Sequence, residues 1–150
     1  MVILIENRQK IINVNLPRLR RDLNRILKII ECEDKEISLL FVDDDAMRKI
    51  NNDFLGRDYP TNVIAFSLTE GAFGDINPHV LGDIVISVET ALRDAKENEI
   101  NFDDELDFLV IHGLLHLLDY NHENTTPEEA ETMKCKEQDI FFQLNGFSIE

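Results

Sequence analysis

Three of the four histidines in this 150-residue chain lie within one short segment, at positions 112, 116 and 122. Residues four apart on an α-helix differ by about 40° of rotation and about 6 Å of rise, so His112 and His116 should point the same way. Two such imidazoles can bind one ion with each nitrogen about 2.0–2.1 Å from it. His122 can join them only if the helix ends near Asp119 and the backbone doubles back. The spacing predicts a site of three neutral imidazoles with water as fourth ligand, which is typical of catalytic zinc.

The alternative interpretation is a core that contains histidines and no metal. One histidine in an apolar helix is usually a buried residue with a satisfied ring, and a pair at this spacing can arise by chance. However, His112 and His116 interrupt the most hydrophobic segment of the chain, and burying two imidazoles costs free energy unless they are coordinated or hydrogen-bonded. We therefore favour the metal site. His79 stands alone in a Gly/Pro-containing segment and is left out of it.

The spacing of the three histidines equals that of the metzincin protease signature, H-E-x-x-H-x-x-G-x-x-H. The glutamate of that signature is the general base, and this chain has Gly113 in its place, while the signature glycine is Asp119. Without that carboxylate, water-mediated peptide hydrolysis lacks its proton acceptor. A metal-dependent hydrolase is favoured over a metallopeptidase, which would need a carboxylate from elsewhere in the fold.

Hydrophobic periodicity predicts the elements that must position these residues. The helix that carries His112 and His116 is apolar nearly all round and should be central to the core. In the second helix, capped by the aspartate at position 44 or 45, Met47, Ile50 and Phe54 should point inward. Residues 69–80 have no period and contain two glycines and a proline, so they should form a loop. The predicted strands span residues 2–6, 36–43, 63–68 and 83–87, and the predicted helices span about 16–30, 44–54, 88–98, 103–118 and 126–145.

Length and composition predict one domain over residues 1–150. An apolar content of 43% and a charged content of 30% are typical of a globular protein. The longest apolar stretch, Leu106–Leu118, is too short for a transmembrane helix, and the N-terminus lacks the basic region of a signal peptide. We therefore expect no membrane association and a cytoplasmic location, with Cys32 and Cys135 as reduced thiols.

The net charge of −15 is unevenly distributed along the chain. Residues 1–60 carry 11 basic and 11 acidic side chains, whereas residues 61–150 carry 4 basic and 19 acidic ones. Four of the basic residues fall on one stripe of the first predicted helix, namely Arg18, Arg21, Arg25 and Lys28. This basic stripe could be an ordinary solvated face, or it could bind phosphate groups despite the overall negative charge.

The segment His112–His122 resembles the signature of the YbeY family, bacterial single-strand-specific metallo-endoribonucleases. The signature is close to H-G-x-L-H-L-x-G-Y-D-H, and this chain departs from it at Asp119 and Asn121. Two further blocks, Gly56–Phe66 and Leu81–Ser87, resemble the family's G-K-D-x-P-T-[DN]-V-L-S-F and L-G-D-[IL]-V-I-[SC]. The order and spacing of the three blocks also fit, so the resemblance covers most of the chain.

This resemblance implies an α+β fold, with a small mixed sheet, about five helices and a zincin-like metal site on a central buried helix. It implies one zinc ion per chain, bound by His112, His116 and His122, and phosphodiester hydrolysis in single-stranded or ribosomal RNA. It also implies maturation of the small-subunit RNA 3′ end, ribosome quality control, and the ribosome or its small subunit as partner. The alternatives are a metzincin-like metallopeptidase and a non-catalytic, ribosome-associated zinc-binding module.

One further departure from the family pattern matters for the chemistry, because it concerns an arginine. Family members carry it just before the glycine of the second block, where this chain has Leu55. Arg57, two residues further on, is our candidate for the catalytic, phosphate-binding arginine. The basic stripe of Arg18, Arg21, Arg25 and Lys28 is our candidate for binding the flanking RNA backbone.

Overall fold

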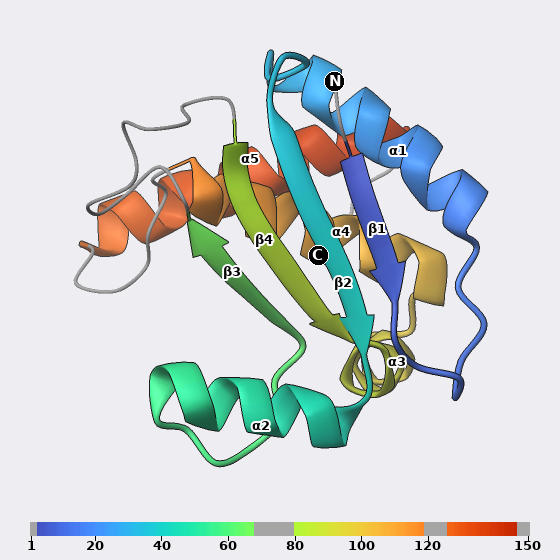
Figure 1. Cartoon of the computed structure of the whole chain (residues 1–150). Helices are drawn as coiled ribbons and strands as arrows, with labels where there is room; N and C mark the ends of the chain where they lie inside the picture. The colour runs from blue at the N-terminus through green and yellow to red at the C-terminus, as the bar shows by residue number, and fades with distance from the viewer. Residues whose placement is uncertain (1–2, 68–79, 119–125, 147–150) are drawn as a thin grey trace.

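The computed structural model describes residues 3–67, 80–118 and 126–146. This part of the chain forms four strands and five helices, so the predicted α+β class with a small mixed sheet is confirmed (Figure 1). The strands are β1 (Ile3–Asn7), β2 (Glu36–Val42), β3 (Val63–Ser67) and β4 (Val80–Ser87). The helices are α1 (Leu16–Ile29), α2 (Asp44–Leu55), α3 (Val88–Glu97), α4 (Phe102–Leu117) and α5 (Pro127–Asn145).

The strands form one sheet in the order β1-β2-β4-β3. Strand β2 pairs in parallel with both β1 and β4, whereas β3 pairs antiparallel with β4 and lies at the edge of the sheet. Strand β4 begins three residues before the predicted position 83, because a register shift opposite Glu36 and Ile37 continues the pairing to Val80. Gly82 adopts a φ of +146° at this irregularity, a conformation open to glycine and costly for other residues.

The two faces of the sheet are covered unequally. Alternate strand residues such as Ile84 and Ile86 face the large core that α1, α3, α4 and α5 complete. Val42 and Val85 face the opposite way and pack with Met47 of α2 in a smaller cluster. In Figure 1, α4 and α5 lie behind the sheet, α1 lies beside the β1 edge, and α2 lies near the β3 edge.

Helix α4 is the central helix that the apolar pattern predicts. Residues around its whole circumference are buried, including Val110 and Ile111, which have no exposed surface. Gly113 allows α4 to lie close to the sheet, because a Cβ atom at this position would stand only 3.0 Å from the Ile84 side chain. Gly113, which stands where the metzincin signature has glutamate, is thus explained by the close packing of α4 on the sheet. None of the described helices is long and apolar enough to cross a membrane.

Two predictions for helix α2 are wrong. Its N-cap is Asp43, whose side chain accepts a hydrogen bond of 2.8 Å from the Ala46 amide. Asp44 instead accepts hydrogen bonds of 2.6 Å from the hydroxyls of Ser87 and Thr90, which tie α2 to the start of α3. Phe54 does not point into the core: its side chain is 69% exposed, because this end of α2 extends past the smaller cluster that Met47 anchors.

Candidate metal centre and substrate pocket

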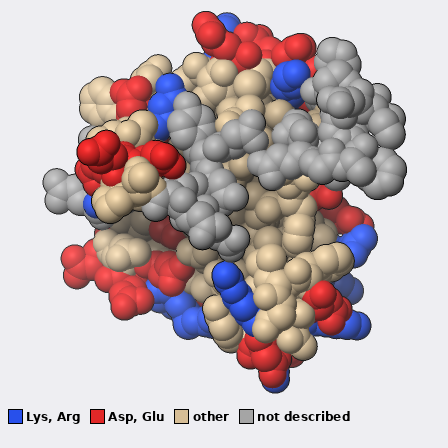
Figure 2. All heavy atoms as spheres, turned by 90° about the vertical axis from the view of Figure 1, so that its left-hand side faces the viewer, with Lys and Arg blue, Asp and Glu red and all other residues tan. Residues whose placement is uncertain are grey.

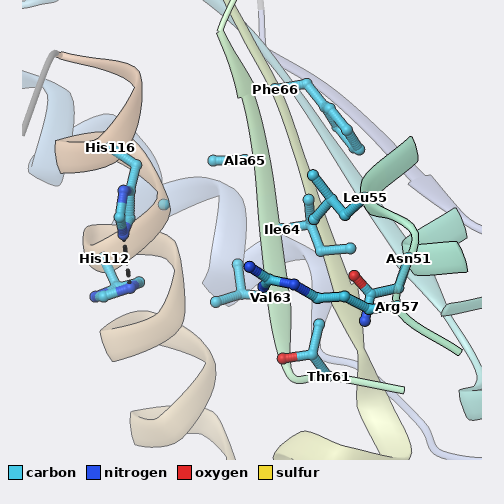
Figure 3. Close-up of a pocket in the computed structure, with 11 residues that line it drawn as sticks. Asn51, Leu55, Arg57, Thr61, Val63, Ile64, Ala65, Phe66, His112 and His116 are labelled. Carbon is cyan, nitrogen blue, oxygen red and sulfur yellow. Dashed lines mark hydrogen bonds between the residues drawn. The ribbon is translucent and has the colours of Figure 1, made fainter. Parts of the chain in front are cut away.

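The side chains of His112 and His116 converge, as their spacing predicts. They lie one turn apart in the second half of α4, with their two Nε2 atoms 3.0 Å from each other (Figure 3). Two ligands about 2.0–2.1 Å from one tetrahedral ion would lie about 3.3 Å apart. The two nitrogens are therefore close to the separation that a shared zinc ion requires.

Glu137 supports the same interpretation from a different helix. Its carboxylate, on the buried face of α5, is hydrogen-bonded to Nδ1 of His112. With Nδ1 donating its proton to this carboxylate, the Nε2 lone pair of His112 points at Nε2 of His116, to which it is hydrogen-bonded. A metal bound between the two rings would replace this hydrogen bond. A carboxylate behind a ligand histidine fixes the tautomer and raises the basicity of the ring. The pair of imidazoles, with Glu137 behind one of them, fits a metal site.

The third predicted ligand, His122, lies outside the described residues. Helix α4 ends at Leu117, as predicted for a chain that must reverse before His122, but the reversal itself stays a prediction. Within residues 3–67, 80–118 and 126–146, no three histidine, cysteine, aspartate or glutamate side chains are grouped as metal ligands. The described part of the site therefore consists of two imidazoles and their carboxylate partner.

A pocket of about 480 Å³ opens in front of the two histidines. His112, Gly113 and His116 form one wall, the edge strand β3 forms the floor, and Leu55 and Arg57 form the opposite wall. Figure 3 shows the Arg57 side chain extending across β3 toward the histidine side of the pocket. Leu55, where the resemblance predicts an arginine, and its predicted substitute Arg57 thus both line the pocket in front of the candidate metal centre.

The segment that carries Arg57 is held in place by three features. Gly56 ends helix α2 in the left-handed conformation, with a φ of +69°, so the chain can turn back toward β3. The side-chain amide of Asn51 donates a 2.8 Å hydrogen bond to the Tyr59 carbonyl. Arg48 forms an exposed ion pair with Asp58, with N–O distances of 2.8 and 3.1 Å. These contacts fix the backbone on both sides of Arg57.

Figure 2 shows the face of the molecule on the β3 side. Among the described residues, charged side chains gather mainly around the rim of this face, and uncharged residues make up much of its centre. The described centre of this face is thus poorer in charged side chains than its rim.

The basic stripe lies away from the pocket. Arg18 points at the first turns of α4, where its guanidinium lies 2.7 Å from Asp103 and 3.4 Å from Asp104. Asp107 is a further carboxylate near Arg18. It lies about 140–180° around the helix axis from the two histidines, so this cluster is on the opposite side of α4 from the pocket. The guanidinium of Arg18 is therefore already paired with carboxylates of α4. A role of Arg18, Arg21, Arg25 and Lys28 in binding RNA stays a prediction.

Asp107 should make the free energy of unfolding depend on pH. It is buried beside Asp22, and burial together with this second carboxyl raises the pKa of Asp107 above its usual range. The folded state then keeps a proton that the unfolded chain releases, so this group's contribution to stability is complete at low pH and is lost as pH rises through the folded-state pKa. Urea denaturation between pH 5 and pH 9 should show stability falling less steeply in Asp107→Asn than in wild type. Asp53→Asn, at an exposed aspartate of α2, should follow the wild-type slope.

Removal of the carboxylate behind His112 should weaken metal binding. Glu137→Gln keeps the size of the side chain but loses its charge, so we expect metal affinity to fall by about 10–100-fold. Competition with a chromophoric zinc chelator measures this affinity directly. Asp139→Asn, at an exposed position of the same helix, is the matched control. Equal affinities in wild type and Glu137→Gln would show that this contact does not support a ligand.

Sequence reasoning missed Glu137, although a signal for it exists. Met133, Glu137, Ile140 and Leu144 recur at helical spacing and form the buried face of α5. A carboxylate in such an apolar stripe requires a polar partner. Only the fold identifies that partner as His112.

This chain is similar to known proteins in sequence and in overall structure. The model of a family described as Endoribonuclease YbeY matches residues 4–145. The chain is 56% identical over 150 residues to Endoribonuclease YbeY of Syntrophus aciditrophicus (strain SB), across 100% of this chain and 94% of that protein. It is 45% identical over 146 residues to Endoribonuclease YbeY of Geobacter sulfurreducens, across 97% of each. It also resembles the solution structure of TM1509 from Thermotoga maritima, with a TM-score of 0.61 and 27% identity, over 96% of this chain and 92% of that one.

Proposed function

Because this chain belongs to the Endoribonuclease YbeY family, we propose that it hydrolyses phosphodiester bonds of single-stranded RNA in the pocket between α4 and the α2–β3 segment. The observation that carries the proposal is the arrangement of the two imidazoles. Their Nε2 atoms lie 3.0 Å apart, Glu137 holds the ring of one of them, and Arg57 lines the facing wall.

The metal in this proposal is one zinc ion, which His112, His116 and His122 would hold. When bound, zinc supplies Lewis-acid stabilisation to a phosphoryl oxygen and favours ionisation of water. The chain's own contribution is to fix the ligands: Glu137 orients His112, and Gly113 keeps α4 against the sheet. The helix and ring that present His112 are thus held in position before RNA enters.

Arg57 would bind the scissile phosphate. A guanidinium carries a permanent positive charge and can donate two parallel hydrogen bonds to phosphate oxygens. Because Arg57 reaches across β3 toward the histidine wall, a phosphate in the pocket would lie between this cation and the imidazoles. Negative charge that builds up on the phosphoryl oxygens would be stabilised from the arginine side.

Exposed aromatic rings near Arg57 support a single-stranded substrate. Phe54 is 69% exposed and Tyr59 is 54% exposed, and the two flank Arg57 in sequence. The ring of Phe54 rests edge-on against Phe66, which lines the pocket, at a centroid distance of 5.4 Å. Unpaired bases can stack on exposed rings, whereas the bases of a duplex are already stacked on each other. These rings are therefore suited to bases that flank the cleaved bond.

The biological substrate in this proposal is ribosomal RNA, processed in the cytoplasm at the 3′ end of the small-subunit RNA and during ribosome quality control. The partner is the ribosome or its small subunit. This part rests on family membership alone, because the geometry of the pocket bears on the shape of the RNA strand and not on which RNA molecule it comes from.

Metal removal tests the proposal. The purified protein should carry about one equivalent of zinc and cleave a single-stranded RNA faster than the same sequence in a duplex. A chelator should abolish cleavage, and added zinc should restore it. RNA binding without cleavage, unaffected by the chelator, would support a non-catalytic module instead. Cleavage of an unstructured peptide but not of RNA would support a metallopeptidase.

A further inference from the structure

A second cavity, of about 390 Å³, adjoins the pocket and shares Val63 and His112 with it. Helices α3, α4 and α5 contribute most of its remaining wall. A strand of RNA whose phosphate lies in the pocket would therefore have a neighbouring nucleotide within reach of this cavity. Apart from His112 and Glu137, the residues that line only this cavity have no functional role assigned above.

Glu105 is the side chain that gives this cavity its chemical character. It lies on the same stripe of α4 as Leu109 and His112, two helical turns before the histidine. It is only 5% exposed and lines the cavity. In the described part of the chain, its carboxyl group makes no hydrogen bond or ion pair, and burial and the nearby Asp94 raise its pKa to about 7. Without donors, the ionised form of this carboxyl is costly, so a ligand that supplies donors would stabilise the ionised form.

The other polar groups of the cavity narrow the choice of ligand. Asp94 adds a second carboxylate, and the Asn62 amide already donates a 3.0 Å hydrogen bond to it. Glu137, whose carboxylate is hydrogen-bonded to His112, also lines the cavity. Three carboxylates disfavour a phosphate group. Phe108 contributes an apolar wall, and Lys134 contributes a cation. The cavity thus suits a flat group that presents several N–H donors and one carbonyl oxygen.

Among the four RNA bases, guanine has this pattern. Its N1–H and N2–H₂ groups are adjacent donors that match the two oxygens of one carboxylate, and its O6 can accept from an ammonium group. Uracil presents a single N3–H between two carbonyl oxygens, which a carboxylate repels. Bases of single-stranded RNA are free to turn their Watson–Crick edge toward such groups.

We propose that this cavity is a nucleobase subsite that binds a guanine next to the cleaved bond, with Glu105 accepting from N1–H and N2–H₂. The proposal rests on the proposed RNA-cleaving function and adds a sequence preference to it. Glu105 is in this proposal a specificity-determining residue, and it plays no part in the chemical step.

Cleavage of uridine tracts that contain one guanosine, one inosine or no substitution tests this subsite. Wild type should cleave next to guanosine about tenfold or more faster, in kcat/KM, than in the plain uridine tract. Inosine, which lacks the N2 amino group, should lose most of this preference. Glu105→Gln should lose the preference for guanosine and cleave the guanosine tract and the plain tract at similar rates. Glu97→Gln, an exposed glutamate of α3 outside the cavity wall, should behave as wild type.

The outcomes separate this inference from the function on which it rests. Cleavage of all tracts at one rate by wild type, or a guanosine preference that survives in Glu105→Gln, would overturn the subsite while leaving the endoribonuclease intact. If wild type cleaves none of the tracts, the proposed function fails. Binding of the uncleaved guanosine and uridine tracts by wild type and Glu105→Gln then tests the subsite alone, and equal affinities would overturn it.

Discussion

His116→Ala should reduce RNA cleavage by about a thousandfold or more and lower the zinc content of the purified protein. The change removes one of the two imidazoles whose Nε2 atoms converge, so metal binding and the several kcal/mol of stabilisation that a metal gives to the reacting phosphoryl group are lost together. Elemental analysis and single-turnover cleavage of a single-stranded RNA measure the two effects in the same preparation. Binding of that RNA should persist.

His79→Ala is the matched control for this experiment, because it removes the histidine that stands alone in the sequence and is left out of the predicted site. It should keep both zinc and activity. Thermal denaturation of His116→Ala distinguishes loss of the site from loss of the fold, since a partly exposed side chain at the pocket wall contributes little to the core. Full zinc content and full activity in His116→Ala would exclude these imidazoles as the metal centre.

Arg57→Ala should lower kcat/KM for RNA by about 100-fold while zinc content stays at the wild-type level. The expected loss is that of one charged donor that stabilises developing negative charge. Lys49→Ala removes an equal charge from helix α2, but Lys49 is exposed and does not line the pocket, so its effect should be small.

Leu55→Arg in the Arg57→Ala background extends this test. Leu55 lines the same wall of the pocket and stands at the position where family members carry arginine. If Arg57 has taken over that function, an arginine introduced at Leu55 should restore part of the lost activity. Unchanged activity in Arg57→Ala, with zinc bound, would remove Arg57 from the mechanism.

Much of the fold follows from local patterns in the sequence. Helical spacing places His112 and His116 on one face of α4, and apolar residues all round that helix place it in the core. The face on which a residue lies and the polarity of that face follow from the 3.6-residue helical period and from residues nearby in the sequence. For the same reason the predicted strands and helices agree with the structure except near their ends. The cap of α2 and the start of β4 differ because the former depends on a contact with α3 and the latter on pairing with β2.

The partners of the site residues are a property of the tertiary structure alone. Glu137 meets His112 across 25 positions of sequence, and Arg18 meets Asp104 across 86. The first contact orients a candidate metal ligand. The second pairs Arg18 with a carboxylate, although helical spacing had made Arg18 a candidate for binding RNA. Arg57 faces the histidines because the edge strand β3 lies between α2 and α4, and Glu105 faces a cavity that three helices and a strand close. A local pattern determines which way a side chain points from its own helix, but the group that it meets depends on how distant elements pack.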